Sequence, residues 1–163
     1  MQSNSEVKGE KMKVMDFLAE SAITIDLAGT NKKTTLQELV ELLKNSGKIK
    51  NTESVLGNLL EREKLGSTGI GQGVAIPHAK SDEVTDVVAA FGISRKGIAF
   101  DALDGEPVRL VFLLVAPQDA SGQHVKALAR VSRLLKDKFL RQALMDSKTV
   151  SDVVRVIHDE DQF

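Results

Sequence analysis

The sequence predicts an α/β protein, a three-layer α/β/α sandwich whose mixed β-sheet of four to five strands is flanked by helices. Two observations lead to this prediction. Segments rich in β-branched and apolar residues occupy the middle of the chain, and segments with helical periodicity precede and follow them. The length of 163 residues, with 42% hydrophobic and 28% charged residues, fits one globular domain. We expect a single domain over residues 12–163, after a polar flexible leader or tag at residues 1–11.

The first third of the chain predicts one strand and two helices. Residues 22–26 alternate as a strand does. Thr35 and Glu38 fit a capping box at the start of a helix that ends at Gly47. The second helix is expected to begin at a cap on Asn51 or Thr52 and to run to about residue 65.

The remaining elements follow a glycine-rich stretch, residues 66–73, which predicts a flexible loop. Residues 108–115 are nearly all apolar, which indicates a central strand buried on both faces. The other predicted strands cover residues 74–76, 87–93 and, as a short one, 98–100. The predicted helices cover residues 123–136, 138–146 and 150–157.

Composition restricts the classes of function. The net charge of −1 creates no field that attracts nucleic acid or an anionic membrane, and six Phe are the only aromatic residues. No stretch approaches the roughly 20 apolar residues that span a bilayer, so we expect no membrane insertion. The absence of cysteine excludes disulfides and thiolate metal sites and is compatible with a cytoplasmic location.

His78 is the first candidate for covalent chemistry. It follows Pro77 at the end of a short apolar run, behind the glycine-rich loop. Proline fixes its own φ and biases Ile76 towards an extended backbone, so His78 is expected to leave a strand on a stiff main chain. An imidazole held in this way is suited to act as a nucleophile, a proton carrier or a metal ligand.

Three other residues deserve comparison with His78. His124 shares the apolar face of a predicted helix with residues 128, 131 and 135, so it is either a half-buried structural histidine or a partner of His78. Arg62 belongs to a charged run at a helix end, where it is either solvated or able to bind phosphate near His78. His158 lies beside a solvated acidic tail, and we expect it to be structural.

Other chemistries fit the sequence less well. The glycine-rich loop matches neither phosphate-binding glycine pattern and follows a predicted helix, which disfavours nucleotide binding. A metal-dependent hydrolase needs three or four convergent ligands, for which His78 and His124 would require Asp82 or Glu83 in addition. A serine hydrolase lacks its G-x-S-x-G elbow.

The motifs around these residues resemble the type-2 EIIA domains of the bacterial phosphoenolpyruvate-dependent phosphotransferase system (PTS). The active-site segment of that family resembles residues 73–79, GVAIPHA. Its arginine-bearing helix resembles residues 59–63, its central strands resemble residues 97–101 and 105–117, and the segment with its second histidine resembles residues 124–128. The resemblance extends over roughly residues 12–157 and includes both the fructose/mannitol type and the nitrogen-regulatory branch.

The resemblance implies a phosphocarrier without a cofactor or metal. His78 would be the phosphorylated residue, His124 its neighbour that stabilises the phosphate, and Arg62 the supporting arginine. The donor would be the small carrier HPr or its nitrogen-branch counterpart. The phosphoryl group would pass to an EIIB domain, or the phosphorylated state would act as a signal on a regulated protein.

Two branches of the family remain open from the sequence. The chain offers no room for an attached EIIB or EIIC domain, which favours a nitrogen-type regulator slightly over a free-standing sugar-specific EIIA component. A carrier must approach His78 closely, so we expect the glycine-rich loop and Ile70 to form the rim of a small docking surface.

Overall fold

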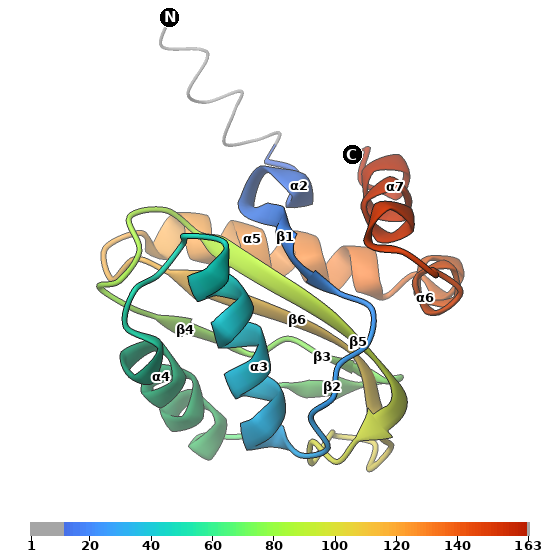
Figure 1. Ribbon diagram of the computed structural model, residues 1–163, viewed down its shortest axis with the longest axis horizontal. Helices are drawn as coiled ribbons and strands as arrows, with labels where there is room; N and C mark the ends of the chain where they lie inside the picture. Colours follow the sequence, from blue (N-terminus) through green and yellow to red (C-terminus); the bar gives the residue numbers. More distant parts are fainter. Residues whose placement is uncertain (1–11, 163) are drawn as a thin grey trace, which may run out of the picture.

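The computed structural model describes residues 12–162 as a six-stranded mixed sheet between two layers of helices (Figure 1). The predicted α/β/α sandwich is confirmed, with one to two more strands than expected. The leader or tag expected at residues 1–11 lies outside the described residues. Within residues 12–162, no helix combines the length and the apolar character needed to cross a membrane.

The elements occur in the following order: α2 (Val14–Phe17), β1 (Leu18–Thr24), α3 (Lys32–Asn45), α4 (Thr52–Lys64), β2 (Gly69–Gly71), β3 (Val74–Ala75), β4 (His78–Lys80), β5 (Val88–Ile98), β6 (Val108–Ala116), α5 (Ser121–Leu135), α6 (Lys138–Met145) and α7 (Val150–Glu160).

Strand β6 organises the sheet. It pairs antiparallel with β5 on one side and parallel with β3 and then β4 on the other. β1 pairs parallel with β5, and β2 pairs antiparallel with β3. Between β3 and β4 lies Pro77, which has no N–H to donate, although its carbonyl accepts the N–H of Leu114 at 2.9 Å. The proline thus divides the chain beside β6 into two short strands, and His78 opens the second.

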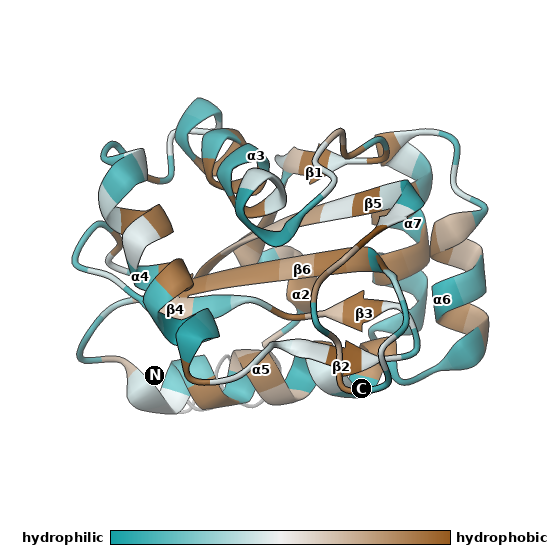
Figure 2. Ribbon diagram, turned by 90° about the horizontal axis from the view of Figure 1, so that it is seen from below, coloured by the Kyte–Doolittle hydropathy of each residue, from teal (hydrophilic) through white to brown (hydrophobic). Residues whose placement is uncertain are grey.

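The core lies on both faces of β6, as the nearly unbroken apolar sequence predicts. Figure 2 shows the hydrophobic colour running along most of this strand. Alternate side chains point to opposite layers because the side-chain period of a strand is two. One set packs towards α2, α5, α6 and α7 and consists of Leu110, Phe112, Leu114 and Ala116. The other packs towards α3 and α4 and includes Val111, Leu113 and Val115, together with Val108 at the start of the strand.

Helix α3 begins one turn earlier than predicted. Asn31 is its N-cap, and its side-chain oxygen accepts the N–H of Thr34 at 2.9 Å. Thr35 is buried inside the helix, and Glu38 accepts two N–H groups from the preceding loop, so the predicted capping box of Thr35 and Glu38 is wrong. Asparagine is a strong N-cap residue, and Asn31 lies four residues before Thr35, so the helix begins there instead.

The strand boundaries also differ from expectation. β1 begins at residue 18 rather than 22, directly after the short helix α2. Of the predicted strand 98–100, only Ile98 belongs to a strand, as the last residue of β5, and Ala99 forms an isolated bridge with Asn31. The predicted loop 66–73 contains β2, which turns into β3 through left-handed backbone at Gly71, Gln72 and Gly73 (φ 98°, 58° and 79°). Of the two predicted caps for α4, Asn51 and Thr52, Asn51 is the one used, and the predicted helix end at Gly47 is confirmed.

Candidate functional site

The three candidate residues come together from three separate elements. His78 opens β4, His124 lies in the first turns of α5, and Arg62 lies in the last turn of α4. All three line one open hollow of about 410 Å³ on the surface. The prediction that His124 and Arg62 lie near His78 is therefore confirmed in space, although the sequence separations are 46 and 16 residues.

The ring of His78 has a defined hydrogen-bonding state. Its Nδ1 lies 2.8 Å from the carbonyl oxygen of Ile76. A carbonyl only accepts hydrogen bonds, so Nδ1 carries the proton and the neutral ring keeps its lone pair on Nε2. Burial is the main cause that lowers the pKa of His78 below its ordinary 6.5, with Arg62 lowering it further. The Ile76 carbonyl and Glu63 act in the opposite direction. His78 is thus neutral at pH 7 with a nucleophilic Nε2.

The ring of His124 lies edge-on to that of His78. Their centroids are 5.5 Å apart and their planes make an angle of 70°. Burial, followed by His78 and Lys80, lowers the pKa of His124 below 6.5, so this ring is also neutral at pH 7. Its Nε2 is buried and has no hydrogen-bond partner among the described residues. A buried polar atom without a partner is rare and costly, which is typical of a group that meets a ligand.

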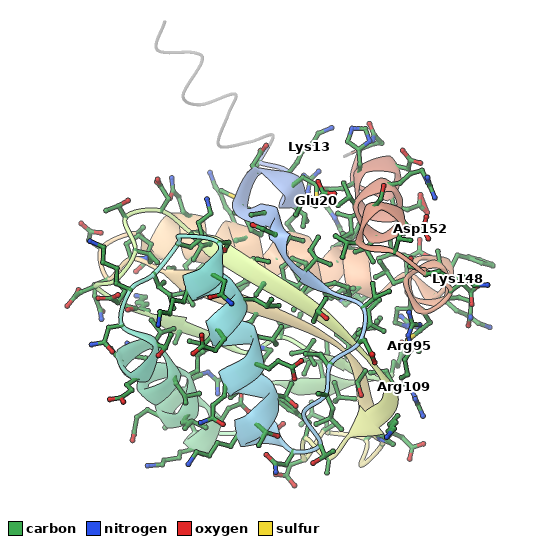
Figure 3. All side chains as sticks on the ribbon, in the orientation of Figure 1. Lys13, Glu20, Arg95, Arg109, Lys148 and Asp152 are labelled. Atoms are coloured by element: carbon green, nitrogen blue, oxygen red, sulfur yellow. The ribbon has the colours of Figure 1, made fainter. Side chains whose placement is uncertain are left out.

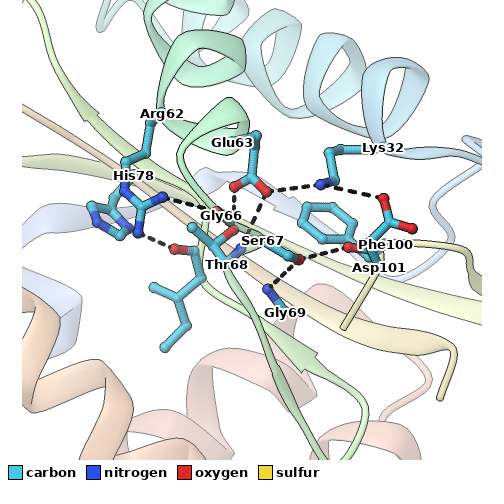
Figure 4. A network of polar contacts seen from close by, with 11 residues as sticks. Lys32, Arg62, Glu63, Gly66, Ser67, Thr68, Gly69, His78, Phe100 and Asp101 are labelled. Atoms are coloured by element: carbon cyan, nitrogen blue, oxygen red, sulfur yellow. Dashed lines mark hydrogen bonds and ion pairs between the residues drawn. The ribbon is translucent and has the colours of Figure 1, made fainter. Parts of the chain in front are cut away.

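The position of Arg62 depends on the loop that follows α4. Its Nη1 donates to the carbonyl oxygen of Gly66 at 2.9 Å, and Figure 4 shows its side chain beside His78. This hydrogen bond to a main-chain oxygen holds the guanidinium at the edge of the hollow. No carboxylate of residues 12–162 pairs with Arg62, so its charge remains available to an anion.

Glu63 holds that loop in place from the buried side of α4. Its side chain, 4% exposed, accepts the N–H of Thr68 at 3.1 Å and the Thr68 hydroxyl. The ammonium of Lys32 lies 3.1 Å from the same carboxylate and 5.0 Å from the ring centroid of Phe100 (Figure 4). The network ties the residues after Gly66 to α3 and α4, and so it orients the carbonyl that Arg62 binds.

Lys80 is a residue of the hollow that sequence reasoning missed. It lines the same hollow, and its Nζ donates to the hydroxyl of Ser121 at 2.8 Å, at the start of α5. His78 and Lys80 are two residues apart on β4, so their side chains share a face. The alternation would have revealed Lys80 if β4 had been recognised as a strand.

The other candidate residues lie elsewhere. Glu83 accepts the backbone N–H groups of Asn51 and then Lys50 at 2.7 and 2.9 Å, which lower its pKa in that order of size. Within residues 12–162 no three His, Cys, Asp or Glu side chains converge as metal ligands. His158 is exposed on α7 beside Asp159, and Ile70 on β2 is not among the residues of the hollow.

The arrangement is suited to receive a phosphoryl group. Two neutral imidazoles share the hollow with two cations, Arg62 and Lys80, and one imidazole presents an unprotonated nitrogen. A cationic surround stabilises the negative charge of a transferred phosphoryl group. The hollow is shallow and open, so a second macromolecule can bring the group to it.

Comparison with known proteins matches the chain to one family. The family model described as "Phosphoenolpyruvate-dependent sugar phosphotransferase system, EIIA 2" covers residues 16–160. A nitrogen regulatory protein from Bradyrhizobium diazoefficiens is 40% identical over 147 residues, which are 90% of this chain and 95% of that protein. The fructose-specific EIIABC component from Bacillus subtilis is 34% identical over 93% of this chain, but the match spans only 24% of that longer protein.

Solved structures agree with this match. The crystal structure of the nitrogen regulatory protein IIA-Ntr from Neisseria meningitidis aligns with a TM-score of 0.80 and 35% identity, over 93% of this chain and 99% of that one. The IIA mannitol protein of Escherichia coli, 23% identical over 85% of this chain and 96% of its own, shares the fold with a TM-score of 0.72.

Proposed function

Since the chain belongs to the EIIA 2 family of the phosphoenolpyruvate-dependent phosphotransferase system and is a phosphocarrier of that system, we propose that its phosphoryl group is carried on Nε2 of His78. The observation that supports this most directly is the bond between Nδ1 and the Ile76 carbonyl. It fixes the tautomer and leaves Nε2 as the nucleophile in a cation-lined hollow.

The transfer needs few chemical groups. Nε2 of His78 attacks the phosphorus of a donor phosphohistidine, a new N–P bond forms, and the N–P bond of the donor breaks, so the electron pair returns to the donor imidazole. The proton on Nδ1 of His78 stays in place, and the Ile76 carbonyl stabilises the positive charge that develops on the ring. Alignment and electrostatic stabilisation supply most of the acceleration in such reactions.

His124, Arg62 and Lys80 stabilise the charge of the phosphoryl group. The unpartnered Nε2 of His124 is available as a donor if its proton resides there, and burial keeps this ring close to His78. Arg62 supplies a planar fork of N–H donors, which matches phosphate geometry. These roles make the protein a phosphotransferase with modest machinery of its own, and the same surface is available for regulation.

We propose that the protein that donates the phosphoryl group is a small phosphohistidine carrier of the HPr type. Two large apolar side chains, Leu65 and Val125, are 83% and 65% exposed, and Leu65 lines the hollow itself while Val125 follows His124. Exposed apolar residues around a reactive group favour a weak protein contact that separates after each turnover. We therefore place the docking rim at Leu65 and Val125.

We infer that the chain acts in the nitrogen-regulatory branch. This rests on two nitrogen regulatory relatives, which match the chain over 95% and 99% of their own length at 40% and 35% identity. The fructose-specific relatives support the alternative, a sugar-specific EIIA component that passes the group to an EIIB domain. A complex between E. coli IIA mannitol and phosphorylated IIB mannitol shows such a partner for that protein.

The test is reconstitution of the phosphorylation chain. The protein is incubated with phosphoenolpyruvate, enzyme I and either HPr or the nitrogen-branch carrier, and its intact mass is measured. We expect one acid-labile, base-stable phosphoryl group, located on residue 78 by peptide mapping. Faster transfer from the nitrogen-branch carrier supports the regulatory branch. Faster transfer from HPr, with onward transfer to a sugar EIIB, supports the alternative, and no phosphorylation from either donor rejects the proposal.

A further inference from the structure

A second cation-lined hollow lies on the helical face of the sheet that also carries α5. It has a volume of about 230 Å³ and lies between the start of β6 and helix α6. Three cations line it, Arg109, Lys138 and Arg141, together with the amides of Gln72 and Gln142, and no carboxylate residue does. None of the functional arguments above uses this hollow.

The two arginines are held by backbone carbonyls. Nη1 of Arg109 donates to the carbonyl oxygen of Arg95, and Figure 3 shows these two residues side by side. The Arg109 guanidinium also lies over Gly97, where a side chain would come within 3.6 Å of its central carbon. Nη1 of Arg141 donates to the carbonyl oxygens of Leu135 and Lys136, at 3.0 and 2.7 Å. Both guanidiniums are thus oriented before any ligand binds.

The three cations have no acidic partner among residues 12–162, in contrast to Lys32 and Arg130, which form ion pairs. Acidic residues close to these cations in the chain accept other hydrogen bonds: Asp137, the N-cap of α6, accepts the N–H groups of Phe139 and Leu140 at 2.8 and 3.2 Å. Asp104 accepts backbone N–H groups of Gln72 and Glu106, at 2.9 and 3.0 Å.

Asp146, the C-cap residue of α6, accepts a hydrogen bond from the Gln142 side-chain amide at 3.0 Å. Three cations without counter-ions in one hollow repel one another, which disfavours this arrangement unless an anion joins them. The protein as a whole has a net charge of only −1, so the cluster does not reflect a generally basic surface.

We propose that this hollow binds a small anion through a phosphate or diphosphate group. Arginine forks match the oxygens of such groups bidentately, and the lysine adds a point charge. The volume suits the charged group of a metabolite, with any larger part of the molecule in solvent. Arg109 lies five residues before Leu114, the β6 partner of His78, so the two sites are about 17 Å apart along the strand.

The experiment is a titration of the whole protein with pyrophosphate, and separately with inorganic phosphate, followed by amide chemical shifts at low ionic strength. We expect shifts at residues 72–73 and 138–142. Lys138→Gln and Arg141→Gln each weaken binding about tenfold or more, since each removes charged hydrogen bonds. Arg141→Lys keeps the charge but loses the fork, so it gives a smaller loss. Lys44→Gln, on the other face of the sheet, is the matched control and leaves the affinity unchanged.

The outcomes also separate this site from His78. Binding that persists in Arg62→Gln but weakens in Lys138→Gln supports the second hollow. Shifts confined to residues around 78 and 124, or an equal affinity in Lys138→Gln, overturn the proposal. Malonate binding as tightly as pyrophosphate overturns the phosphate specificity. Circular dichroism reports whether Arg141→Gln still folds, and Lys138→Gln, on an exposed residue, keeps the test valid if it does not. Binding is measured without any carrier, so the result is independent of phosphorylation at His78.

Discussion

The two hollows along α5 differ in one respect that decides their chemistry. Both are lined by cations, and each has one that is bonded to an end of α5: Lys80 to the Ser121 hydroxyl at its start, and Arg141 to the carbonyls of Leu135 and Lys136 at its end. Only the first contains imidazoles, and only there does a main-chain carbonyl fix the proton of one ring. Cations alone favour binding of an anion, whereas a neutral ring with a directed lone pair adds the capacity to form a bond.

Replacing His78 should have the largest effect. His78→Ala removes the nucleophile, so acid-labile phosphorylation is expected to disappear completely, while the fold is retained because the side chain is only partly buried. His158→Ala is the matched control, since this exposed histidine lies outside the hollow. Phosphorylation is followed by intact mass and folding by circular dichroism. A phosphorylated His78→Ala protein contradicts the assignment.

His124→Ala should slow transfer without abolishing it. Loss of one preorganised group that stabilises developing charge typically costs about 10²–10³ in rate. Rapid quench with a phosphorylated carrier measures the single-turnover rate, and His158→Ala again controls for loss of a histidine. A wild-type rate in His124→Ala would show that this ring only fills space beside His78.

The sequence predicted the three candidate residues of the hollow better than the contacts that position them. His78, Arg62 and His124 belong to motifs that include a proline, a helix end and an apolar helix face, and each of these leaves a local pattern. Glu63 belongs to a run of charged residues that predicts a solvent-exposed helix face, yet its side chain is buried. Its burial depends on contacts with Lys32 and Thr68, which come from other segments and leave no local pattern. Lys80 was missed because a three-residue strand has too few residues for its alternation to be visible.

The secondary structure was likewise predicted well where local signals decide it and poorly where distant contacts do. The apolar run of β6 and the capped start of α4 at Asn51 are local signals, and both predictions are confirmed. β2 depends on pairing with β3 through a left-handed turn, which its glycines permit but do not specify. The start of α3 was predicted wrongly, because only the Thr35 and Glu38 pattern was recognised as a cap, whereas Asn31 caps the helix.

Glu63→Gln tests whether that network positions Arg62. Removing the negative charge of Glu63 weakens its contacts to Lys32 and Thr68. The Gly66 carbonyl is then expected to shift, and the Arg62 guanidinium bonded to it is expected to shift as well. We expect a roughly 10- to 100-fold loss in transfer rate with an unchanged apparent KM for the carrier, since a misplaced group affects the reacting geometry. Glu53→Gln, exposed in the first turn of the same helix, is the control.

Thr68→Val provides a second test of the same network. It removes the hydroxyl bonded to Glu63 and should reduce the rate in the same direction by a smaller factor. Urea unfolding measures how much stability each variant loses. If Glu63→Gln loses stability but transfers at the wild-type rate, the network is structural and does not position Arg62.

Leu65→Ser should affect docking rather than chemistry. Truncating an exposed apolar side chain at the hollow is expected to raise the apparent KM for the carrier roughly fivefold, or ~1 kcal/mol, with little change in kcat. Leu103→Ser is the matched control because Leu103 is similarly exposed, 78% against 83%, and does not line the hollow. Equal KM values in the two variants, or a larger effect of Ile70→Ser, would move the docking rim to β2.

The smallest effect should be on the pH dependence of stability. The folded-state pKa values of His78 and His124 lie below 6.5, mainly because of burial. The unfolded chain therefore binds more protons than the folded protein as the pH falls through 6.5, and the free energy of unfolding decreases there. Above 6.5 both rings are neutral in both states and the full stability is present. Urea titrations from pH 8 to 5 should show this decrease, and it should be shallower in a His78→Gln, His124→Gln double variant. An identical slope in the double variant would mean that neither ring resists protonation, and it would remove the argument that His78 is a neutral nucleophile at pH 7.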